Sequence, residues 1–386
     1  MVSNCSGSGV GDEDYMMSEE ELSCWLVFSQ MKGLRINDDQ FRDIIDRYEN
    51  LINLFEASKD ELLASRLFKP EIVRSFLDQK SKADPEQMLK DLERSETRAI
   101  PFSHVLYPPK LRHIHHPPLV LYMKGKLQPE DFHASIGIVG TRQPTAYGKK
   151  LAKDFSRDLA KAGATIVSGM AVGIDSLAHW GALEASGKTV AVLASGVDYC
   201  YPSANRPLYD KLIEEEVGAV VSEYFPGVKP DKWRFPARNR IVAGMSDGLL
   251  VVEAGESSGA LITANLAFNQ SRAVFAIPGR IDSRMSKGTN SIISRDMAKL
   301  VSSPEEIMDE MNWVSAKMER RVPTVVELFG REKEVFEMLS NEPLHFDYLC
   351  QEMEMGAGEL SGTLTMLELA GVVERLPGDW FSKIDN

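Results

Sequence analysis

Apolar and polar positions alternate in blocks over the middle of the chain. Between Ser135 and Ser303, apolar runs of four to six residues recur every 25 to 30 residues, and segments with helical spacing separate them. A helix-length crossover returns the chain to the same edge of a sheet, so strands in this order pair in parallel. The predicted strands are Ile136–Gly140, Thr165–Gly169, Val190–Ser195, Val220–Glu223, Leu249–Glu253 and Val274–Ile277. We therefore predict an α/β domain built on a parallel sheet.

Nearly every predicted strand ends in a loop of small residues that can donate hydrogen bonds to phosphate. These loops include Gly140-Thr141-Arg142, Ser168-Gly169 and Ser257-Ser258-Gly259, the last with Thr263 one turn further on. The carboxyl ends of parallel strands meet at one edge of a sheet, where helix N-termini direct N–H groups at an anion. The sequence thus predicts a phosphate-binding crevice at this edge.

The first of these loops departs from both common nucleotide-binding patterns. A dinucleotide site needs Gly-x-Gly-x-x-Gly so that pyrophosphate can contact bare backbone, and Arg142 stands where the second glycine should be. The Gly-x-x-x-x-Gly-Lys-Ser/Thr loop of ATPases is also missing. Because arginine offers a planar fork to a phosphate held further out, the loop favours a nucleic-acid backbone over a cofactor. On its own, a turn with an exposed arginine explains it equally well.

Asp175 and His179 lie four residues apart on the helix after the second strand, and this spacing invites an acid–base interpretation. No nucleophile stands at a convincing spacing from them. A helix-capping Asp175 with a packed His179 is therefore favoured, and we expect no catalytic residue.

Arg238 and Arg240 flank Asn239 at another predicted helix start. Two cations at the positive end of a helix repel each other unless an anion lies between them. Glu253 is one candidate partner, and a phosphate is the other.

Composition is typical of a soluble protein of two or three domains. The chain has 386 residues, 43% of them hydrophobic, and no run approaches the roughly 20 apolar residues of a membrane span. The N-terminus does not have the pattern of a signal peptide, and the four cysteines form no close pair. His113, His115 and His116 have no carboxylate or thiol at ligand spacing beside them. We expect a cytoplasmic protein without a metal, a cofactor or a membrane contact.

Charge divides unevenly along the chain. The total is −13, but Lys and Arg outnumber Asp and Glu by 20 to 17 in residues 131–300, whereas residues 301–386 carry 7 against 18. The predicted sheet domain is therefore mildly basic and suits an anionic ligand, and the acidic C-terminal segment would repel one.

Helical spacing flanks the sheet domain on both sides. The predicted organisation is a disordered leader at 1–17, a helical domain at 18–90, a linker with the entry strand Leu119–Met123 at 91–130, the sheet domain at 131–305, a linker at 306–324 and a C-terminal domain at 325–386. In the last domain, three short helices and a closing strand at Trp380-Phe381 follow the order of a winged helix. Its acidity favours a protein-docking face, or a flap that competes with DNA, over DNA reading.

Several motifs in this order resemble the DNA-processing protein A (DprA/Smf) family. They are Val139-Gly140-Thr141-Arg142, Val167–Asp175 with Ala178-His179, Tyr201-Pro202, Ser222-Glu223-Tyr224, Phe235–Ile241, Ser258–Ala264, Ile277-Pro278-Gly279 and, near the C-terminus, Leu367–Gly378. The resemblance covers about 170 residues of the sheet domain. It implies an extended Rossmann-like fold with an N-terminal domain like a sterile alpha motif (SAM) and a C-terminal winged-helix-like domain.

The resemblance also implies a function. It implies a homodimer that binds and protects incoming single-stranded DNA and loads the RecA recombinase in natural transformation and homologous recombination, without catalysis. The residues expected to bind phosphate are Gly140, Thr141, Arg142, Ser168, Gly169, Gly173, Lys188, Arg206, Arg238, Asn239, Arg240, Ser258, Gly259 and Thr263. One departure is Ser203, which follows Tyr201-Pro202 where many family members have lysine; Lys188 and Arg206 are the nearest cations.

Two other classes stay open from the residues. A Rossmann-like nucleotide hydrolase of the lysine-decarboxylase-like type also has Gly-rich loops at strand ends, but its Pro-Gly-Gly-x-Gly-Thr signature is replaced by Ala254–Ser258. A pure protein scaffold would have no use for so many donor loops.

An unusually apolar helix late in the sheet domain bears on assembly. Its residues Leu261, Ile262, Leu266, Ala267 and Phe268, followed by Met285, Ile292-Ile293 and Met297, exceed what one packed face needs. A two-fold contact between identical chains is a common use of such excess.

Overall fold

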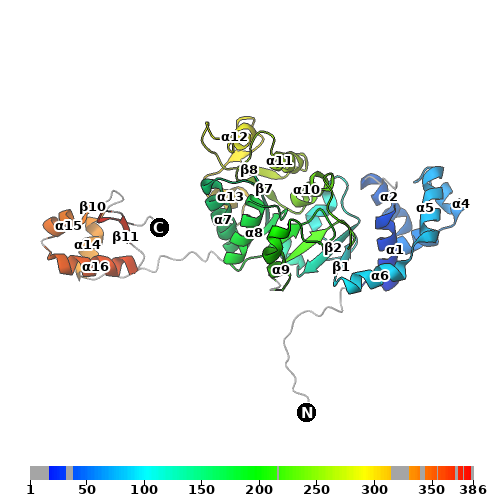
Figure 1. The fold of residues 1–386 in the computed structure, drawn as a ribbon, viewed down its shortest axis with the longest axis horizontal. Coiled ribbons are helices and arrows are strands. Elements are labelled where there is room, and N and C mark those ends of the chain that lie inside the picture. The colour runs from blue at the N-terminus through cyan, green and yellow to red at the C-terminus, as the bar shows by residue number, and fades with distance from the viewer. Residues whose placement is uncertain are drawn as a thin grey trace, which may run out of the picture. The chain divides into compact units, whose positions relative to one another are not determined.

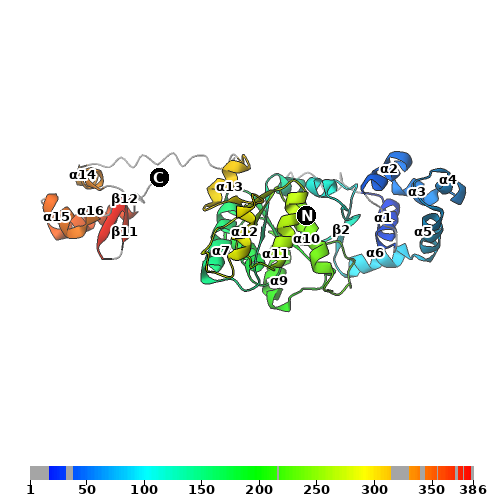
Figure 2. The ribbon, with the colours of Figure 1, turned by 90° about the horizontal axis from the view of Figure 1, so that it is seen from above.

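A mixed sheet with a reversal of strand order organises the larger part of the molecule (Figures 1 and 2). In the computed structural model, the described residues are 17–31, 38–214, 217–313, 330–339, 344–353, 355–369, 373–376 and 378–383. The chain divides into two compact units, Met1–Val314 and Ser315–Asn386. Within the described residues, no helix is both long and apolar enough to cross a membrane. The predicted leader lies outside the described residues except for Met17.

The described part of the first unit contains a nine-stranded sheet in the order β1-β2-β6-β5-β4-β3-β7-β8-β9. Its strands are β1 (Arg98–Pro101), β2 (Val120–Gly125), β3 (Ser135–Val139), β4 (Thr165–Ser168), β5 (Thr189–Val192), β6 (Gly218–Ser222), β7 (Gly248–Val251), β8 (Ala273–Ala276) and β9 (Lys299–Leu300). Strands β3 to β9 pair in parallel, and β1 and β2 are antiparallel. The chain builds outward from β3 to β6 and then returns to the other side of β3 with β7. A crevice opens where strand order reverses in this way.

Helices cover both faces of the sheet, which explains why its central strands are apolar throughout. They are α7 (Ala146–Lys161), α8 (Ile174–Glu184), α9 (Arg206–Glu214), α10 (Arg234–Gly244), α11 (Gly259–Asn269), α12 (Lys287–Ser294) and α13 (Pro304–Glu310). One face packs on α7, α8 and α13 through residues such as Ile138 and Phe155. The other packs on α10 and α11 through residues such as Val251 and Ala264. Figure 1 shows these two layers on either side of β7 and β8.

The N-terminal helices cover the antiparallel edge of the sheet. They are α1 (Glu19–Gln30), α2 (Asp38–Tyr48), α3 (Leu51–Glu56), α4 (Lys59–Ala64), α5 (Pro70–Lys82) and α6 (Pro85–Arg94). Trp25 and Phe28 of α1 are fully buried in one cluster with Tyr122 of β2. The Tyr122 hydroxyl lies 3.2 Å from Ser29 Oγ, so a hydrogen bond also joins the helices to the sheet.

The second unit has its own apolar core. It contains α14 (Gly330–Met338), β10 (Leu344–His345), α15 (Phe346–Glu352), α16 (Ala357–Leu369), β11 (Val373–Leu376) and β12 (Trp380–Lys383). The described strands pair in the order β10-β12-β11, and Leu349, Leu364 and Phe381 are buried together. This is the helix–strand order that the sequence predicts for a winged helix.

The predicted strands of the sheet domain are confirmed, each displaced by at most three residues at its ends. The predictions missed β1 and β9, which are only four and two residues long. Helix α13 also lies in the sheet unit, because Ile307 is buried in the core with Phe155 and Trp313 packs against them. The sheet domain therefore continues past the predicted end at residue 305, into the predicted linker.

Candidate nucleic-acid interface

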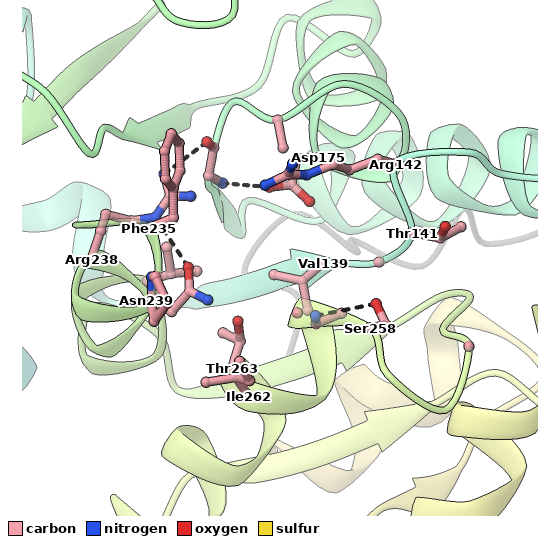
Figure 3. Close-up of a pocket in the computed structure, with 18 of the residues that line it drawn as sticks. Val139, Thr141, Arg142, Asp175, Phe235, Arg238, Asn239, Ser258, Ile262 and Thr263 are labelled. Atoms are coloured by element: carbon pink, nitrogen blue, oxygen red, sulfur yellow. Dashed lines mark hydrogen bonds between the residues drawn. The ribbon is translucent and has the colours of Figure 1, made fainter. Parts of the chain in front are cut away.

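A cavity of about 810 Å³ opens at the carboxyl edge of the sheet, where β3 and β7 lie side by side (Figure 3). The loops after β3, β4 and β7 and the first turns of α10 and α11 line it. Its lining includes Gly140, Thr141, Arg142, Gln143, Gly169, Asp175, Tyr201, Lys232, Phe235, Arg238, Asn239, Ser257, Ser258, Gly259, Ile262 and Thr263. The crevice predicted from the strand-end loops is thus present at the point where strand order reverses.

Glu253 fixes the loop that carries Arg142. This buried carboxylate accepts hydrogen bonds from the Thr145 backbone nitrogen at 2.9 Å and the Thr145 hydroxyl at 2.6 Å, and its backbone oxygen accepts from Thr141 N at 2.7 Å. Gly148 is needed here, because an added Cβ would lie 2.1 Å from Glu253 Oε2. The suggestion that Glu253 pairs with Arg238 or Arg240 is wrong: the carboxylate holds the start of α7.

Arg142 itself is exposed at the rim of the cavity. Its guanidinium carbon lies 5.9 Å from the centre of the Phe235 ring, and Phe235 in turn lies 5.5 Å from the ring of Tyr201. Among the residues that the structure describes, no carboxylate forms an ion pair with Arg142. The fork of donors predicted from the sequence is therefore available to an anion, beside a pair of aromatic rings.

Arg238 lies at the floor of the cavity and serves the protein's own backbone. Its guanidinium donates to the Gly169 oxygen at 2.8 Å and to the Val192 oxygen, and its Nε donates to Asn239 Oδ1 at 3.2 Å. Burial lowers the pKa of Arg238 to about 10, and Asp175 opposes that shift. The side chain is only 5% exposed. It therefore adds positive charge below the floor of the cavity and does not offer its guanidinium at the surface for direct contact with phosphate.

Asp175 and His179 are both buried near this floor. The Asp175 carboxylate accepts from Gly169 N at 3.2 Å and holds the loop after β4; the N-cap of α8 is Gly173, so Asp175 does not cap the helix. Burial raises the pKa of Asp175, while Arg238 opposes the rise. His179 Nδ1 lies 2.7 Å from the Thr189 hydroxyl, and burial lowers its pKa to about 3. His179 is thus a neutral packed histidine.

Gly169 is the meeting point of these groups. A Cβ on Gly169 would lie 2.6 Å from Arg238 Nη2 and 2.8 Å from Asp175 Oδ2. The loop after β4 therefore requires glycine because a cation and a carboxylate approach its backbone from two sides.

Arg240 is not among the residues that line the cavity. Its guanidinium forms two hydrogen bonds with the Glu223 carboxylate, at 2.6 and 2.9 Å, and Nε donates to the His116 oxygen at 3.1 Å. The pair is 19% exposed on each side. Arg240 thus joins the loop after β6 to α10, and its carboxylate partner is Glu223 instead of the predicted Glu253.

Gly173 lines a smaller neighbouring groove, and three other expected phosphate ligands do not line the cavity either. The Ser168 hydroxyl is fully buried and donates to the Ile138 oxygen at 2.6 Å. Lys188 precedes β5 and lies at the amino edge of the sheet, opposite the cavity. Arg206 is on α9 and pairs with Asp210 at 2.7 Å. These residues are close to the motifs in sequence, but the strand direction or their own hydrogen bonds separate them from the site.

The start of α11 forms the opposite wall of the cavity, as the sequence predicts. Ser258 is its N-cap and accepts from Ala260 N at 3.3 Å. Gly259 is exposed and has open space where a Cβ would stand, while Thr263 is buried one turn below. Figure 3 shows this wall facing Arg142 across the end of β3 at Val139. The positive end of a helix therefore faces an exposed guanidinium across the cavity.

A smaller groove of about 460 Å³ lies on the other side of the Arg142 loop. Gly173, Ser176 and Lys149 line it together with Arg142 and Gln143. At Gly173 φ is +90°, and a Cβ would lie 2.5 Å from the Thr141 oxygen, so glycine is required where the two loops touch. The Arg142 loop thus forms a ridge between two hollows.

Sequence reasoning missed several residues of the cavity. Lys232 and Phe235 come from the segment before Arg238, and Tyr201 lies next to Phe235. The signal was present, because cations interleaved with aromatic residues are typical of nucleic-acid binding. Within the described residues, no group of three or more potential metal ligands is found.

Fold and site together define an α/β protein of the Rossmann type with a crevice lined by Arg142, Lys232 and Arg238 at the carboxyl edge of its sheet. Two family models match the chain: DNA recombination-mediator protein A over residues 98–312, and the DprA winged helix domain over residues 322–379. The chain belongs to the DNA processing protein A (DprA/Smf) family.

Curated relatives and solved structures are similar to large parts of the chain. Protein Smf of Synechocystis sp. is 32% identical over 94% of this chain and 98% of its own length. DNA processing protein DprA of Bacillus subtilis is 42% identical over 55% of this chain and 70% of its own length. The crystal structure of DprA from Streptococcus pneumoniae matches with a TM-score of 0.64 at 32% identity, covering 76% of this chain and 98% of that one. A structure describing the single-stranded DNA binding mode of DNA processing protein A from Helicobacter pylori has a TM-score of 0.51 at 29% identity, covering 56% and 96%.

Proposed function

We propose that this protein binds single-stranded DNA in the cavity at the carboxyl edge of its sheet. The observation that carries the proposal is the rim at Arg142, where a guanidinium without an ion-pair partner among the described residues lies beside the Phe235 ring. The guanidinium suits a phosphate and the ring suits the face of an unpaired base. The binding mode described for the Helicobacter pylori relative supports the same ligand.

Single strands suit this site better than duplex DNA. In a duplex the base faces are stacked on one another, so an aromatic side chain in a cavity cannot reach them without unstacking. The cavity is also flanked by the groove that Arg142 shares with Lys149, which gives a strand a continuous path across the ridge. With roughly three to five phosphates neutralised, log affinity should fall against log salt with a slope of about −2 to −3.5.

A salt-dependent titration with single-stranded and double-stranded oligonucleotides tests the proposal. Arg142→Ala should weaken single-strand binding and reduce the magnitude of the salt slope by about 0.7, the share of one phosphate. Arg206→Ala is the matched control, because Arg206 is 61% exposed, pairs with Asp210 and lies outside the cavity. Equal binding by the wild type and the Arg142 variant would remove this rim from the site.

We propose that the protein protects the bound strand and loads the RecA recombinase onto it. This would take place in the cytoplasm, during natural transformation and homologous recombination. Membership of the DNA processing protein A family supports this role. In a mixture of single-stranded DNA, a single-strand-binding protein and recombinase, the protein should shorten the delay before the recombinase covers the strand. The Arg142→Ala variant should lose that effect in proportion to its affinity, and an unchanged delay with the wild type would refute the role.

We also propose that the protein acts as a homodimer. The sequence predicts an apolar contact surface on α11 and the segment after it. Two of its residues, Ala267 and Ile292, are buried in the core, so a charge at Ile292 would test the core and not an interface. Ile262 and Phe268 of α11 remain 46% and 54% exposed. Phe268→Asp should therefore give monomers that still bind a short oligonucleotide but lose the gain in affinity on a long one, because two sites raise the effective concentration. Sedimentation showing a wild-type monomer at micromolar concentration would contradict the dimer.

We propose no catalysis at this site. Asp175 and His179 are buried, and Asp175 accepts from Gly169 N. The hydroxyl beside His179 is that of Thr189, which is itself fully buried and donates to the Ile166 oxygen at 2.8 Å. The alternative, a Rossmann-like nucleotide hydrolase, predicts release of base or phosphate from a nucleotide panel by the purified chain. Turnover that disappears in Asp175→Ala would overturn the proposal in its favour.

A further inference from the structure

A second group of aromatic and cationic side chains lies just outside the cavity. Arg234 places its guanidinium carbon 5.0 Å from the centre of the Tyr224 ring and 5.1 Å from that of the Trp233 ring. The two rings are 6.2 Å apart with an interplanar angle of 89°. Tyr224 follows β6, and Trp233 and Arg234 begin α10. We call these three residues the outer aromatic cluster.

The outer aromatic cluster has the same composition as the cavity rim, namely one arginine and two aromatic rings. At the rim an arginine, Arg142, lies against Phe235, which contacts Tyr201; in the outer cluster Arg234 lies against Trp233, which contacts Tyr224. Trp233 and Phe235 are neighbours but one in the chain. The rim and the outer cluster therefore both begin from the first turn of α10.

Trp233 is exposed and yet held in place. Its indole nitrogen donates to Asp231 Oδ2 at 2.8 Å, and Arg234 lies over its ring while donating to the Lys229 oxygen. The side chain remains 59% exposed, more than Tyr201 or Ile262. Holding a large apolar surface rigidly in water gives the fold little, but it removes the entropy cost of ordering that ring when a ligand binds.

The surroundings of Trp233 favour an anionic partner with flat apolar faces. The segment 229–235 carries Lys229, Lys232 and Arg234 against one carboxylate, Asp231. That carboxylate accepts from the Lys232 backbone nitrogen at 2.6 Å as well as from the indole. Lys232 lines the cavity, so positive charge continues from the cavity to the cluster. Stacking surfaces interleaved with cations are the means by which proteins hold single strands without reading sequence.

We propose that the outer aromatic cluster is a second stacking site for an unpaired base, next to the base held at the rim. The inference rests on the proposed single-strand binding and extends it by naming where the strand leaves the cavity. Trp233 supplies the ring face, and Arg234 with Tyr224 positions it. The ligand chemistry is a flat base on a sugar–phosphate backbone, independent of sequence.

The test compares two oligonucleotides of about 12 nucleotides, one of thymidine and one abasic throughout, titrated against the full chain. Trp233→Ala should weaken binding of the thymidine strand about 5- to 100-fold and change binding of the abasic strand less than twofold. Trp233→Phe should keep most of the affinity, because it keeps a ring. The salt slope should stay as in the wild type, since no phosphate contact is removed.

Trp380→Ala is the matched control, because Trp380 is another exposed tryptophan, 43% exposed, in the C-terminal unit. It should leave both titrations unchanged. Wild-type affinity for the thymidine strand in Trp233→Ala would overturn the inference and leave the cluster to a protein contact. Equal losses on both strands would also overturn it, because stacking needs a base. If the wild type binds neither strand, the proposed function itself fails, which separates the two.

Discussion

The two units of this chain place their charged groups in opposite ways. In the sheet unit Arg238, Asp175 and Glu253 are buried and hold the loops around the cavity. In the C-terminal unit the core is apolar, Ser382 is the buried polar residue among those described, and ion pairs such as Arg331 with Glu334 are more than half exposed. Burying a charge costs several kcal/mol unless partners compensate. The sheet unit buries charged groups where they hold the loops around the cavity, whereas the described part of the C-terminal unit has an apolar core.

The contrast extends to the surfaces that could meet DNA. The cavity rim presents Arg142 and Lys232. Helix α16, which stands where a winged helix carries its recognition helix, contains Glu359 and Glu368 and no lysine or arginine. A recognition helix needs cations to approach phosphate, so the same fold here lacks the means to read DNA with that helix. The difference shows that the charged groups of the site, and not the fold class, are the reason to propose the nucleic-acid contact in the sheet unit.

The largest effect should come from removing the buried cation. Arg238→Ala leaves Asp175 without its opposing charge and two backbone oxygens without a donor, so it should destabilise the sheet unit by about 3–5 kcal/mol. Arg331→Ala, the surface counterpart, should cost at most about 0.5 kcal/mol in the C-terminal unit. Urea unfolding of both variants checks this. Similar losses in the two would erase the contrast between the units.

A smaller effect is expected at Glu253. Glu253→Ala removes the acceptor of two Thr145 donors, which should cost about 1–3 kcal/mol and loosen the Arg142 loop. Single-strand affinity should fall with it, although Glu253 is itself an anion and does not line the cavity. Tighter binding after loss of this negative charge would show that the carboxylate acts by repulsion and not by positioning.

His179 should give the sheet unit a pH dependence in acid. Its pKa is about 3 in the fold against an ordinary 6.5, so between these values the unfolded chain binds a proton that the native chain does not. Stability therefore falls as pH falls through this window, with a limiting slope of about 1.4 kcal/mol per pH unit. The raised pKa of Asp175 acts with the opposite sign. His179→Asn should flatten the decline, measured by urea midpoints from about pH 7 to 4.5; an unchanged decline would assign it to other groups.

The smallest effect is expected from deleting the C-terminal unit. Truncation at residue 322 removes the acidic domain, and single-strand affinity should stay within about twofold if the unit is a protein-docking face. An acidic flap that competes for the cavity predicts tighter binding after truncation, most evident at low salt. Weaker binding would contradict both uses and would mean that cations such as Arg331 or Lys333 contact DNA despite the overall charge.

The sequence by itself determined the order of elements and the edge of the sheet where ligand loops gather. Apolar runs at a spacing of 25 to 30 residues require parallel pairing, and the six predicted strands follow. Arg142 lies exposed in the loop after the first strand, which fits both the phosphate ligand and the plain turn that the sequence left open. The edge strands β1 and β9 were not predicted, because segments of four and two residues are too short to show a periodic pattern.

Only the tertiary structure decided which polar side chains face the ligand and which face the protein. Arg238 and Arg240 are identical in type and two residues apart, yet one lies beneath the cavity against Gly169 and the other pairs with Glu223 outside its lining. Gly169 is 69 residues from Arg238 and Glu223 is 17 residues from Arg240, so no local pattern distinguishes the two arginines. Lys188 does not reach the cavity because it precedes β5 and so lies at the amino end of that strand, whereas the cavity lies at the carboxyl ends. A sequence fixes what a side chain can do, whereas the direction of the strands and the long-range partners fix where it does it.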